Sequence, residues 1–426
     1  MILMESREAV VTFIDYKAAF DTESQLFLDE ALSNAGVSIK VRRVIQAIFR
    51  AATGCVRIGE STSDQFDISR GVLQGDIFSP VAFIAGFWKI FSTYDKESAG
   101  VTVGSDPYKV TVKALEYADD ASLLDENTAC TSERLSSIAR GSREEASMII
   151  SVPKTKGMHV HKTADVSETT EEEVQALKLK HKCPALNCGR TFTTQRGLRI
   201  HQARWCDDGQ TVRSRKGSLA DMAVKLSKQK ALEAERPQVI MESERIENVH
   251  SFVYLGAKTQ CDGNSLADVK HRMIIAQEEF SSYFHIWNDS HLPLSIKMHL
   301  YRTALCTTLT HACEAWSLTT SVLRCINGFN SRCLHTVTNK SYRETATSPD
   351  FDLLLAIRKR RLRYLGHILR LPNDRLLKRT LYAYVNTAAG PPEGSLLLDC
   401  GTSTLNELEL LANDRRAWRA LIASLS

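Results

Sequence analysis

The sequence has no apolar run long enough to cross a membrane and an odd number of cysteines. A membrane helix needs about 20 apolar residues, and the longest candidate, residues 81–88, is far shorter, so we expect no membrane partner. Charged side chains at Glu5, Arg7 and Glu8 argue against a secretory signal. The 11 cysteines cannot all pair within one chain, so we expect a reduced, intracellular protein.

Acidic residues are missing from one stretch and scarce in another, although the whole chain is nearly neutral. The 426 residues carry 54 Lys and Arg against 50 Asp and Glu, a net charge of +4, which is too small to indicate a nucleic-acid partner by itself. Residues 176–206 contain seven basic residues and no acid, and residues 358–379 contain nine Lys or Arg with Asp374 as the single acid. The length predicts two or three domains.

Strand-like and helix-like segments alternate in residues 8–165, which predicts an α+β fold. The β-branched, apolar segment 9–16 predicts a buried strand. Ser79 is the predicted N-cap of a helix with Pro80 at its first position. The other predicted elements here are two helices within 25–50 broken near 36–38, a hairpin turning at 61–63, the Ser79 helix to 94, strands 109–115 and 121–124, a helix over 133–147 and a strand over 157–161.

Carboxylates gather at the ends of two predicted strands. Asp15 ends the first strand, and Asp119 and Asp120 follow Tyr117 and Ala118 in a predicted tight hairpin. Adjacent acids repel each other unless a cation lies nearby, and Mg²⁺ is held by a few carboxylates together with substrate phosphates. Two such ions would stabilise the attacking and leaving oxygens of a phosphoryl displacement. For the Asp119–Asp120 pair alone, the alternative is a cap on a solvated turn.

Four segments in order resemble motifs A to D in the palm of reverse transcriptases, specifically those of non-LTR (LINE-type) retrotransposons. The segments are FIDYKAAFD from Phe13, RGVLQGDIFSP from Arg70, YADD from Tyr117 and KTK from Lys154. The resemblance covers roughly residues 8–160 and 248–420. It implies an RNA-directed DNA polymerase that extends a DNA primer on an RNA template with deoxynucleoside triphosphates, and a nuclear location.

The resemblance implies a role for each of ten residues. Asp15, Asp119 and Asp120 would bind two Mg²⁺ ions and catalyse the reaction, and Lys154 would donate a catalytic proton near the triphosphate. Phe20 would be a steric gate against a nucleotide 2′-OH, and Gln74 and Gly75 would contact the template and the incoming base pair. The primer end would be bound by Tyr254, Leu255 and Gly256. The last three resemble motif E; as a tripeptide alone they are a weak signal, which their position after motif D strengthens.

The C-terminal region is predicted to be helical, and its segments 359–367 and 414–418 continue the resemblance. A basic helix with Tyr364 suits a phosphate backbone and a stacked base; the alternative is a solvated basic face. Family members carry fingers before motif A, and only 14 residues precede Asp15. We therefore expect an N-terminally truncated, partial copy without fingers. The alternative function is a catalytically decayed remnant that binds nucleic acid without polymerising it.

Cys183, Cys188, His201 and Cys206 have the ligand spacing of a single zinc finger. Phe192 and the residues around it fit the hydrophobic positions of a ββα finger, so we expect one structural Zn²⁺ ion. The basic residues of the finger suit phosphate contacts, and a purely structural module is the competing interpretation. Together these patterns predict a palm without fingers over 1–165, a small zinc finger over 176–210, a charged linker over 211–247, and the palm end, helical thumb and basic C-terminal region over 248–426.

Overall fold

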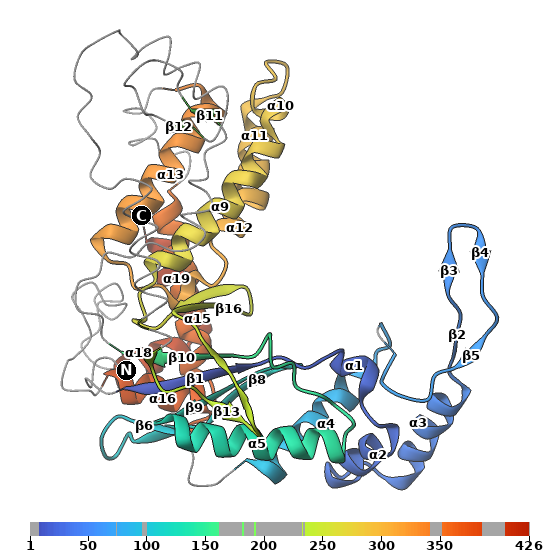
Figure 1. The fold of residues 1–426 in the computed structure, drawn as a ribbon. Coiled ribbons are helices and arrows are strands. Elements are labelled where there is room, and N and C mark those ends of the chain that lie inside the picture. Colours follow the sequence, from blue (N-terminus) through green and yellow to red (C-terminus); the bar gives the residue numbers. More distant parts are fainter. Residues whose placement is uncertain are drawn as a thin grey trace. The chain divides into compact units, whose positions relative to one another are not determined.

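The computed structural model describes residues 8–73, 75–95, 100–161, 181–182, 191–192, 232, 235–340, 352–385 and 405–425. The chain divides into two compact units, one of Met1–Lys162 with Pro237–Ser426 and one of Thr163–Arg236. Helices and strands mix along the first unit, which confirms the predicted α+β class (Figure 1). Among the helices of these described residues, none combines the length and apolar character that a membrane span requires.

A five-stranded sheet lies in the first unit, with the order β15-β10-β1-β9-β8. The central strand β1 pairs antiparallel with both neighbours, and Ile14 lies opposite Ala121 in β9. Antiparallel pairing also joins β8 to β9 in a hairpin, whereas β15 runs parallel to β10. The strands are β1 (Ala9–Ile14), β8 (Ala114–Tyr117), β9 (Asp120–Asp125), β10 (Lys156–Val160) and β15 (Glu247–Asn248).

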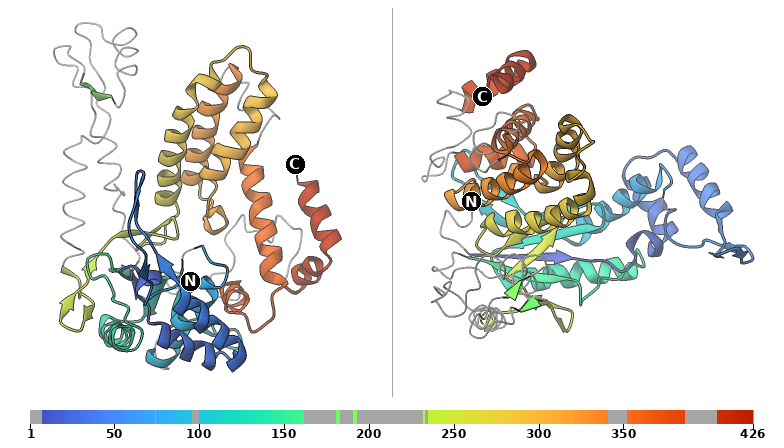
Figure 2. Two further views of the ribbon diagram at one scale, coloured as in Figure 1. Left: turned by 90° about the vertical axis from the view of Figure 1, so that its right-hand side faces the viewer. Right: turned by 90° about the horizontal axis from the view of Figure 1, so that it is seen from above.

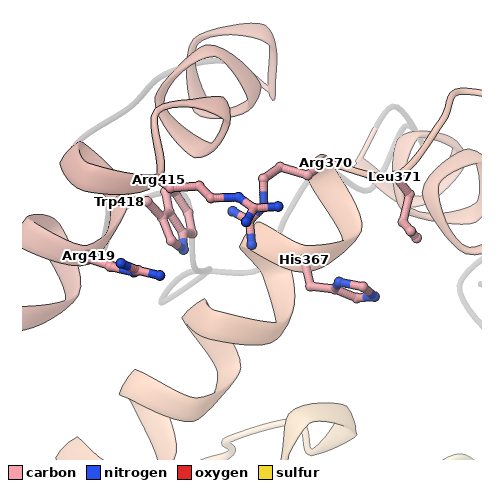
Figure 3. A pocket seen from close by; sticks show the side chains of 6 residues that line it. All are labelled: His367, Arg370, Leu371, Arg415, Trp418 and Arg419. Carbon is pink, nitrogen blue, oxygen red and sulfur yellow. The ribbon is translucent and has the colours of Figure 1, made fainter.

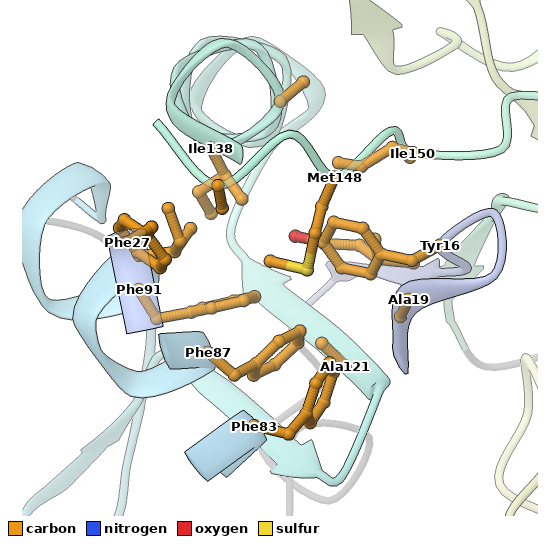
Figure 4. Close-up of a cluster of buried hydrophobic side chains, with 14 of the residues drawn as sticks. Tyr16, Ala19, Phe27, Phe83, Phe87, Phe91, Ala121, Ile138, Met148 and Ile150 are labelled. Atoms are coloured by element: carbon orange, nitrogen blue, oxygen red, sulfur yellow. The ribbon is translucent and has the colours of Figure 1, made fainter. Parts of the chain in front are cut away.

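Four helices pack together beside this sheet and supply half of the buried residues of its main apolar core. They are α2 (Gln25–Asn34), α3 (Ile39–Ala51), α4 (Ser79–Tyr94) and α5 (Thr128–Glu144). Phe83, Phe87 and Phe91 recur on one side of α4, as Figure 4 shows; Phe83 stacks on Phe87, and the ring of Phe91 contacts Phe87 at a tilt. Tyr16 reaches this cluster from the residues after β1 and contacts Phe87 edge-on. Each fully buried side chain of this size contributes about 1.5–3 kcal/mol, so α4 anchors the chain that follows β1.

A buried ion-pair group fixes α5 against β9. The guanidinium of Arg134 is fully buried and lies 2.6 Å from Asp95 and 2.7 Å from Asp125. It also donates to the carbonyl oxygens of Leu124 and Lys113. Removing one partner of such a buried pair typically costs about 3–5 kcal/mol because the other charge is left uncompensated. The group therefore locks the strand that begins at Asp120.

Helices dominate the rest of the first unit and form two further cores. The first is built by α9, α11, α12, α13 and the start of α15, which pack side by side (Figure 2). The second is built by the end of α15 with α16, α18 and α19. The bounds are α9 (Leu266–Ser282), α11 (Leu294–Leu300), α12 (Cys306–Leu309), α13 (Thr320–Thr338), α15 (Leu353–Leu369), α16 (Leu376–Val385), α18 (Leu405–Asn413) and α19 (Arg415–Ser424).

Three predicted boundaries differ from those in the structure. The hairpin of β3 (Arg57–Ile58) and β4 (Ser61–Thr62) turns at Gly59, not at 61–63, because Gly59 adopts the positive φ that a two-residue turn needs. Ser79 lies inside α4 and does not cap it. α5 begins five residues earlier than predicted, at Thr128, because the Asn127 side chain accepts a hydrogen bond from the backbone N–H of Cys130.

Candidate active site

Asp15 and Asp120 lie at the same end of the central strand pair. Asp15 directly follows Ile14, and Asp120 directly precedes Ala121, the residue opposite Ile14. Antiparallel pairing places the end of β1 beside the start of β9. The sheet thus brings together two aspartates that are 105 positions apart in the sequence.

Asp119 lies next to Asp120 in the hairpin turn between β8 and β9. Tyr117 pairs with Asp120, so the turn consists of Ala118 and Asp119, with Ala118 at a φ of 54°. This confirms the predicted tight hairpin. Burial raises the pKa of Asp120, and the negative charges of Asp119 and Asp15 raise it further. The carboxylates therefore repel one another, and a cation among them would relieve that repulsion.

Oδ2 of Asp15 is a candidate ligand for such a cation. Its Oδ2 is buried and accepts no hydrogen bond from any residue that the structure describes. The Lys154 ammonium lies 3.5 Å from it, an ion-pair distance. The backbone of Asp15 is held by Ser151, whose N–H donates to the Asp15 carbonyl oxygen at 2.7 Å. An unsatisfied carboxylate oxygen beside two further carboxylates is the kind of donor set that Mg²⁺ uses.

The carboxylates of Asp15, Asp119 and Asp120 are not close enough together in this structure to coordinate one metal ion jointly. Within the described ranges, no three His, Cys, Asp or Glu side chains converge closely enough to hold a metal ion. Asp15, Asp119 and Asp120 share one end of the sheet, and rotation of their side chains would be needed for joint coordination. The Lys154 side chain is 71% exposed and the Asp15 side chain 35% exposed, so both can reorient.

Phe20, a predicted nucleotide-binding residue, is joined to the start of the loop that leads to Gly75. Phe20, in α1 (Ala19–Thr22), stacks on Phe83 with 4.2 Å between ring centroids. Its carbonyl oxygen accepts a hydrogen bond from the N–H of Val72, which joins it to the loop after Arg70. A Cβ on Gly71 would lie 2.5 Å from the same oxygen, so only glycine fits there. Gly75 follows in this loop at a φ of 93°, and Gln74 lies outside the described residues.

The predicted primer-binding residues form a second tight hairpin. Tyr254 ends β16 (Ser251–Tyr254), and β17 (Ala257–Gln260) follows directly after Leu255 and Gly256. Both turn residues have positive φ, 49° and 76°. The Tyr254 hydroxyl lies 3.3 Å from the carbonyl oxygen of Asp120 and can donate a hydrogen bond to it. The structure thus connects this hairpin to the turn that carries the acidic pair.

Two residues that the sequence did not indicate hold this hairpin in place. Arg272 of α9 donates a hydrogen bond to the carbonyl oxygen of Gly256. The Nε2 atom of His311 lies 3.3 Å from the carbonyl oxygen of Leu255. Both contacts join residues far apart in the chain, and no local motif marks them. They link the helical region to the hairpin beside Asp120.

The predicted zinc ligands Cys183, Cys188, His201 and Cys206 lie outside the described residues. In their unit, β11 (His181–Lys182) and β12 (Thr191–Phe192) pair antiparallel, with His181 opposite Phe192. An antiparallel hairpin at this position agrees with the first half of a ββα finger. The ligand geometry itself stays a prediction.

Comparisons with known proteins identify the family. The sequence profile of the family described as "Reverse transcriptase (RNA-dependent DNA polymerase)" matches residues 3–257. A curated relative, the "Retrovirus-related Pol polyprotein from type-1 retrotransposable element R2" of Popillia japonica, is 30% identical over 162 residues, which are 36% of this chain and 22% of the relative. The match thus spans about a fifth of that polyprotein.

Two solved structures are similar over longer stretches. Telomerase from Candida albicans with a fragment of telomeric RNA covers 80% of this chain and 49% of its own, with 12% identity and a TM-score of 0.37. Apo telomerase from Candida tropicalis covers 88% of this chain and 53% of its own, with 12% identity and a TM-score of 0.32. The assignment rests on the family profile, which spans more than half of the chain and includes Asp15, Asp119 and Asp120. The chain belongs to the reverse transcriptase (RNA-dependent DNA polymerase) family.

Proposed function

We propose that this chain is an RNA-directed DNA polymerase of a non-LTR retrotransposon, which extends a DNA primer 3′-OH on an RNA template. The observation that carries this proposal is the register of β1, β9 and β8, which gathers Asp15, Asp119 and Asp120 at one end of the sheet. The retrotransposon origin is supported by the relative from Popillia japonica, which is the Pol polyprotein of a retrotransposable element.

The acidic group would hold two Mg²⁺ ions, whose charge stabilises the attacking and leaving oxygens of phosphoryl transfer. The chain's own part is to position and orient its carboxylates. Asp15 presents a buried oxygen without a hydrogen-bond donor among the described residues. The Lys154 ammonium, 3.5 Å from that oxygen, places an N–H proton beside the site. Its exposed ammonium can turn towards a triphosphate and donate that proton to the leaving group.

Phe20 would select deoxynucleotides. Its ring is stacked on the buried Phe83, which is itself packed on Phe87. A ring held in this way cannot move aside without breaking aromatic contacts worth about 0.5–1.5 kcal/mol each beyond the buried area. A nucleotide with a 2′-OH would clash with it. The loop through Gly71 and Gly75, tied to the Phe20 carbonyl, would place the base pair against the same ring.

The test is primer extension on poly(rA)/oligo(dT) with Mg²⁺ and labelled dTTP. We expect Mg²⁺-dependent synthesis that falls at least about a hundredfold in Asp119→Asn, equivalent to about 2.7 kcal/mol of transition-state stabilisation. Asp64→Asn is the matched control, because Asp64 is an exposed aspartate in the hairpin region of β3 and β4. Its rate should equal that of the wild-type protein.

The same experiment separates the enzyme from the alternative, a remnant that only binds nucleic acid. Primer–template binding without any Mg²⁺-dependent product would overturn the polymerase proposal. Synthesis that survives Asp119→Asn would instead show that the acidic group has been assigned wrongly.

A further inference from the structure

The ends of α15 and α19 approach each other unusually closely. A Cβ on Gly366 of α15 would lie 2.3 Å from Nε1 of Trp418 in α19, so only glycine permits this packing. The Trp418 Nε1–H donates to the carbonyl oxygen of Leu362 at 3.2 Å. Trp418 is only 3% exposed and belongs to the apolar core beneath the two helices. The relative position of α15 and α19 is therefore fixed by packing.

Two adjoining cavities of about 360 Å³ and 330 Å³ open above this contact, and both are lined by Arg370, Trp418 and Arg419. Arg415 also lines the first, and Lys359 and Arg363 the second. Figure 3 shows the side chains of Arg370 and Arg415 reaching towards each other from the two helices. We call this surface the basic cleft and define it by its five cationic residues, Lys359, Arg363, Arg370, Arg415 and Arg419.

No acidic side chain is among the described residues that line the basic cleft. Arg370 is held in place by a 2.9 Å hydrogen bond to the carbonyl oxygen of Ala412. Its pKa is lowered, first by burial and then by Arg415 and Arg419. Fixing like charges together costs free energy, and a bound anion would recover it.

The size of the basic cleft favours a polyanion over a single small anion. From Lys359 to Arg370 the cleft follows eleven residue steps of α15, about 16 Å at 1.5 Å per residue. That length matches about five nucleotides of one strand at 3.4 Å each. Arginine guanidinium groups bind phosphate oxygens in a bidentate manner. Trp418 is too buried to stack on a base, so the contacts would be to the backbone and independent of base sequence.

We propose that the basic cleft binds consecutive backbone phosphates of the primer–template, at a site separate from the acidic group around Asp15. The proposal rests on the proposed function, since it takes the nucleic acid of that reaction as the ligand. In this proposal α15, the basic helix around Arg363, binds the nucleic-acid backbone together with α19, which packs against it. The cleft would hold the nucleic acid without contributing to nucleotide addition.

The experiment measures binding of a fluorescent RNA–DNA hybrid to the full chain by anisotropy over a range of salt concentrations. The double variant Arg415→Gln/Arg419→Gln should bind about 10–100-fold more weakly than wild type, by a similar factor for two unrelated sequences. The slope of log K against log salt should become shallower by about 2, close to 0.9 for each lost phosphate contact. Arg416→Gln is the control, because Arg416 is exposed on the same helix and lines neither cavity.

Three outcomes would overturn the proposal. The first is unchanged affinity and salt slope in the double variant, provided that its circular dichroism spectrum matches wild type. The second is an equal loss in Arg416→Gln, which would indicate general charge and not a site. The third outcome comes from a parallel measurement with phosphatidylserine vesicles. It is a double variant that binds these vesicles more weakly than wild type does but binds the hybrid equally well. A failed primer-extension test would leave these binding results intact, so the two proposals can fail separately.

Discussion

At the scale of single residues, Glu23 is a buried acid whose carboxyl group has no hydrogen-bond partner among the described residues. It is fully buried, and neither carboxylate oxygen finds a hydrogen-bond partner among the described residues. A Cβ on Gly86 of α4 would lie 2.0 Å from its Oε1 atom, so the carboxyl group rests against a glycine of the helix. Burial raises the pKa of Glu23 well above its ordinary value. The group is therefore neutral in the folded protein at acidic pH.

Replacing Glu23 with glutamine should stabilise the protein at neutral pH and have little effect below about pH 4.3, the ordinary glutamate pKa. The unfolded chain loses the Glu23 proton as pH rises through that value, while the folded protein retains it. Stability therefore falls with rising pH in the wild-type protein, up to the raised pKa of the folded state. Glu23→Gln removes this dependence. Urea unfolding at pH 4 and pH 7.5 measures both quantities.

The control for this change is Glu60→Gln, at an exposed glutamate of the β3–β4 turn. It should leave the difference in unfolding free energy between the two pH values as it is in wild type. If Glu23→Gln is as pH-dependent as wild type, then Glu23 is not the buried acid responsible.

At the scale of elements, the contact between α15 and α19 depends on Gly366. Alanine usually favours a helix over glycine by about 1 kcal/mol, but here the added methyl would overlap the Trp418 ring. We expect Gly366→Ala to lower the free energy of unfolding by about 1–3 kcal/mol, the usual cost of overpacking. It should also weaken nucleic-acid binding by separating the two sides of the basic cleft.

A glycine in another helix provides the comparison. A Cβ on Gly328 of α13 would meet only Arg332 Nη1 at 3.6 Å, an ordinary contact. Gly328→Ala should therefore be neutral or stabilising by up to about 1 kcal/mol. Chemical denaturation of both variants measures the contrast, and equal effects would show that the closeness of α15 and α19 has no energetic consequence.

Elements were predictable from the sequence where a local pattern determines them. The apolar run of β1, the helix break near Gly36 and the hairpin before Asp120 all occur as predicted. Boundaries were wrong where one side-chain hydrogen bond or one glycine conformation decides, as at Asn127 and Gly59. Arg272 could not be assigned to the site, because its contact with Gly256 depends on the packing of α9.

At the scale of the whole molecule, motif order predicted which acids share one end of the sheet. The basic cleft was not predictable. Its charges were visible as separate runs near Arg363 and Arg415, but only the packing around Trp418 joins them. The burial of Glu23 is likewise set by contacts with α4 that no local pattern indicates.

For the second unit, we propose one Zn²⁺ ion held by Cys183, Cys188, His201 and Cys206. The antiparallel pair of β11 and β12 supports this, because a ββα finger begins with such a hairpin. Elemental analysis of the purified full chain should find one zinc per chain, and Cys183→Ser/Cys188→Ser should lose it. Cys55→Ser, at an exposed free cysteine, is the control. Absence of zinc from the wild-type protein prepared with zinc present would contradict the assignment.

The hairpin of β8 and β9 has a consequence for how this protein can vary. Its turn contains only Ala118 and Asp119, and β9 continues from Asp120 in fixed register with β1. Side chains along a strand alternate between the two faces of a sheet. Insertion of one codon between Asp120 and Ala121 would turn Asp120 to the opposite face while the rest of β9 kept its register with β1, even if every other residue were kept. This segment therefore tolerates changes of residue type far better than changes of length, and related chains should differ there by substitution alone.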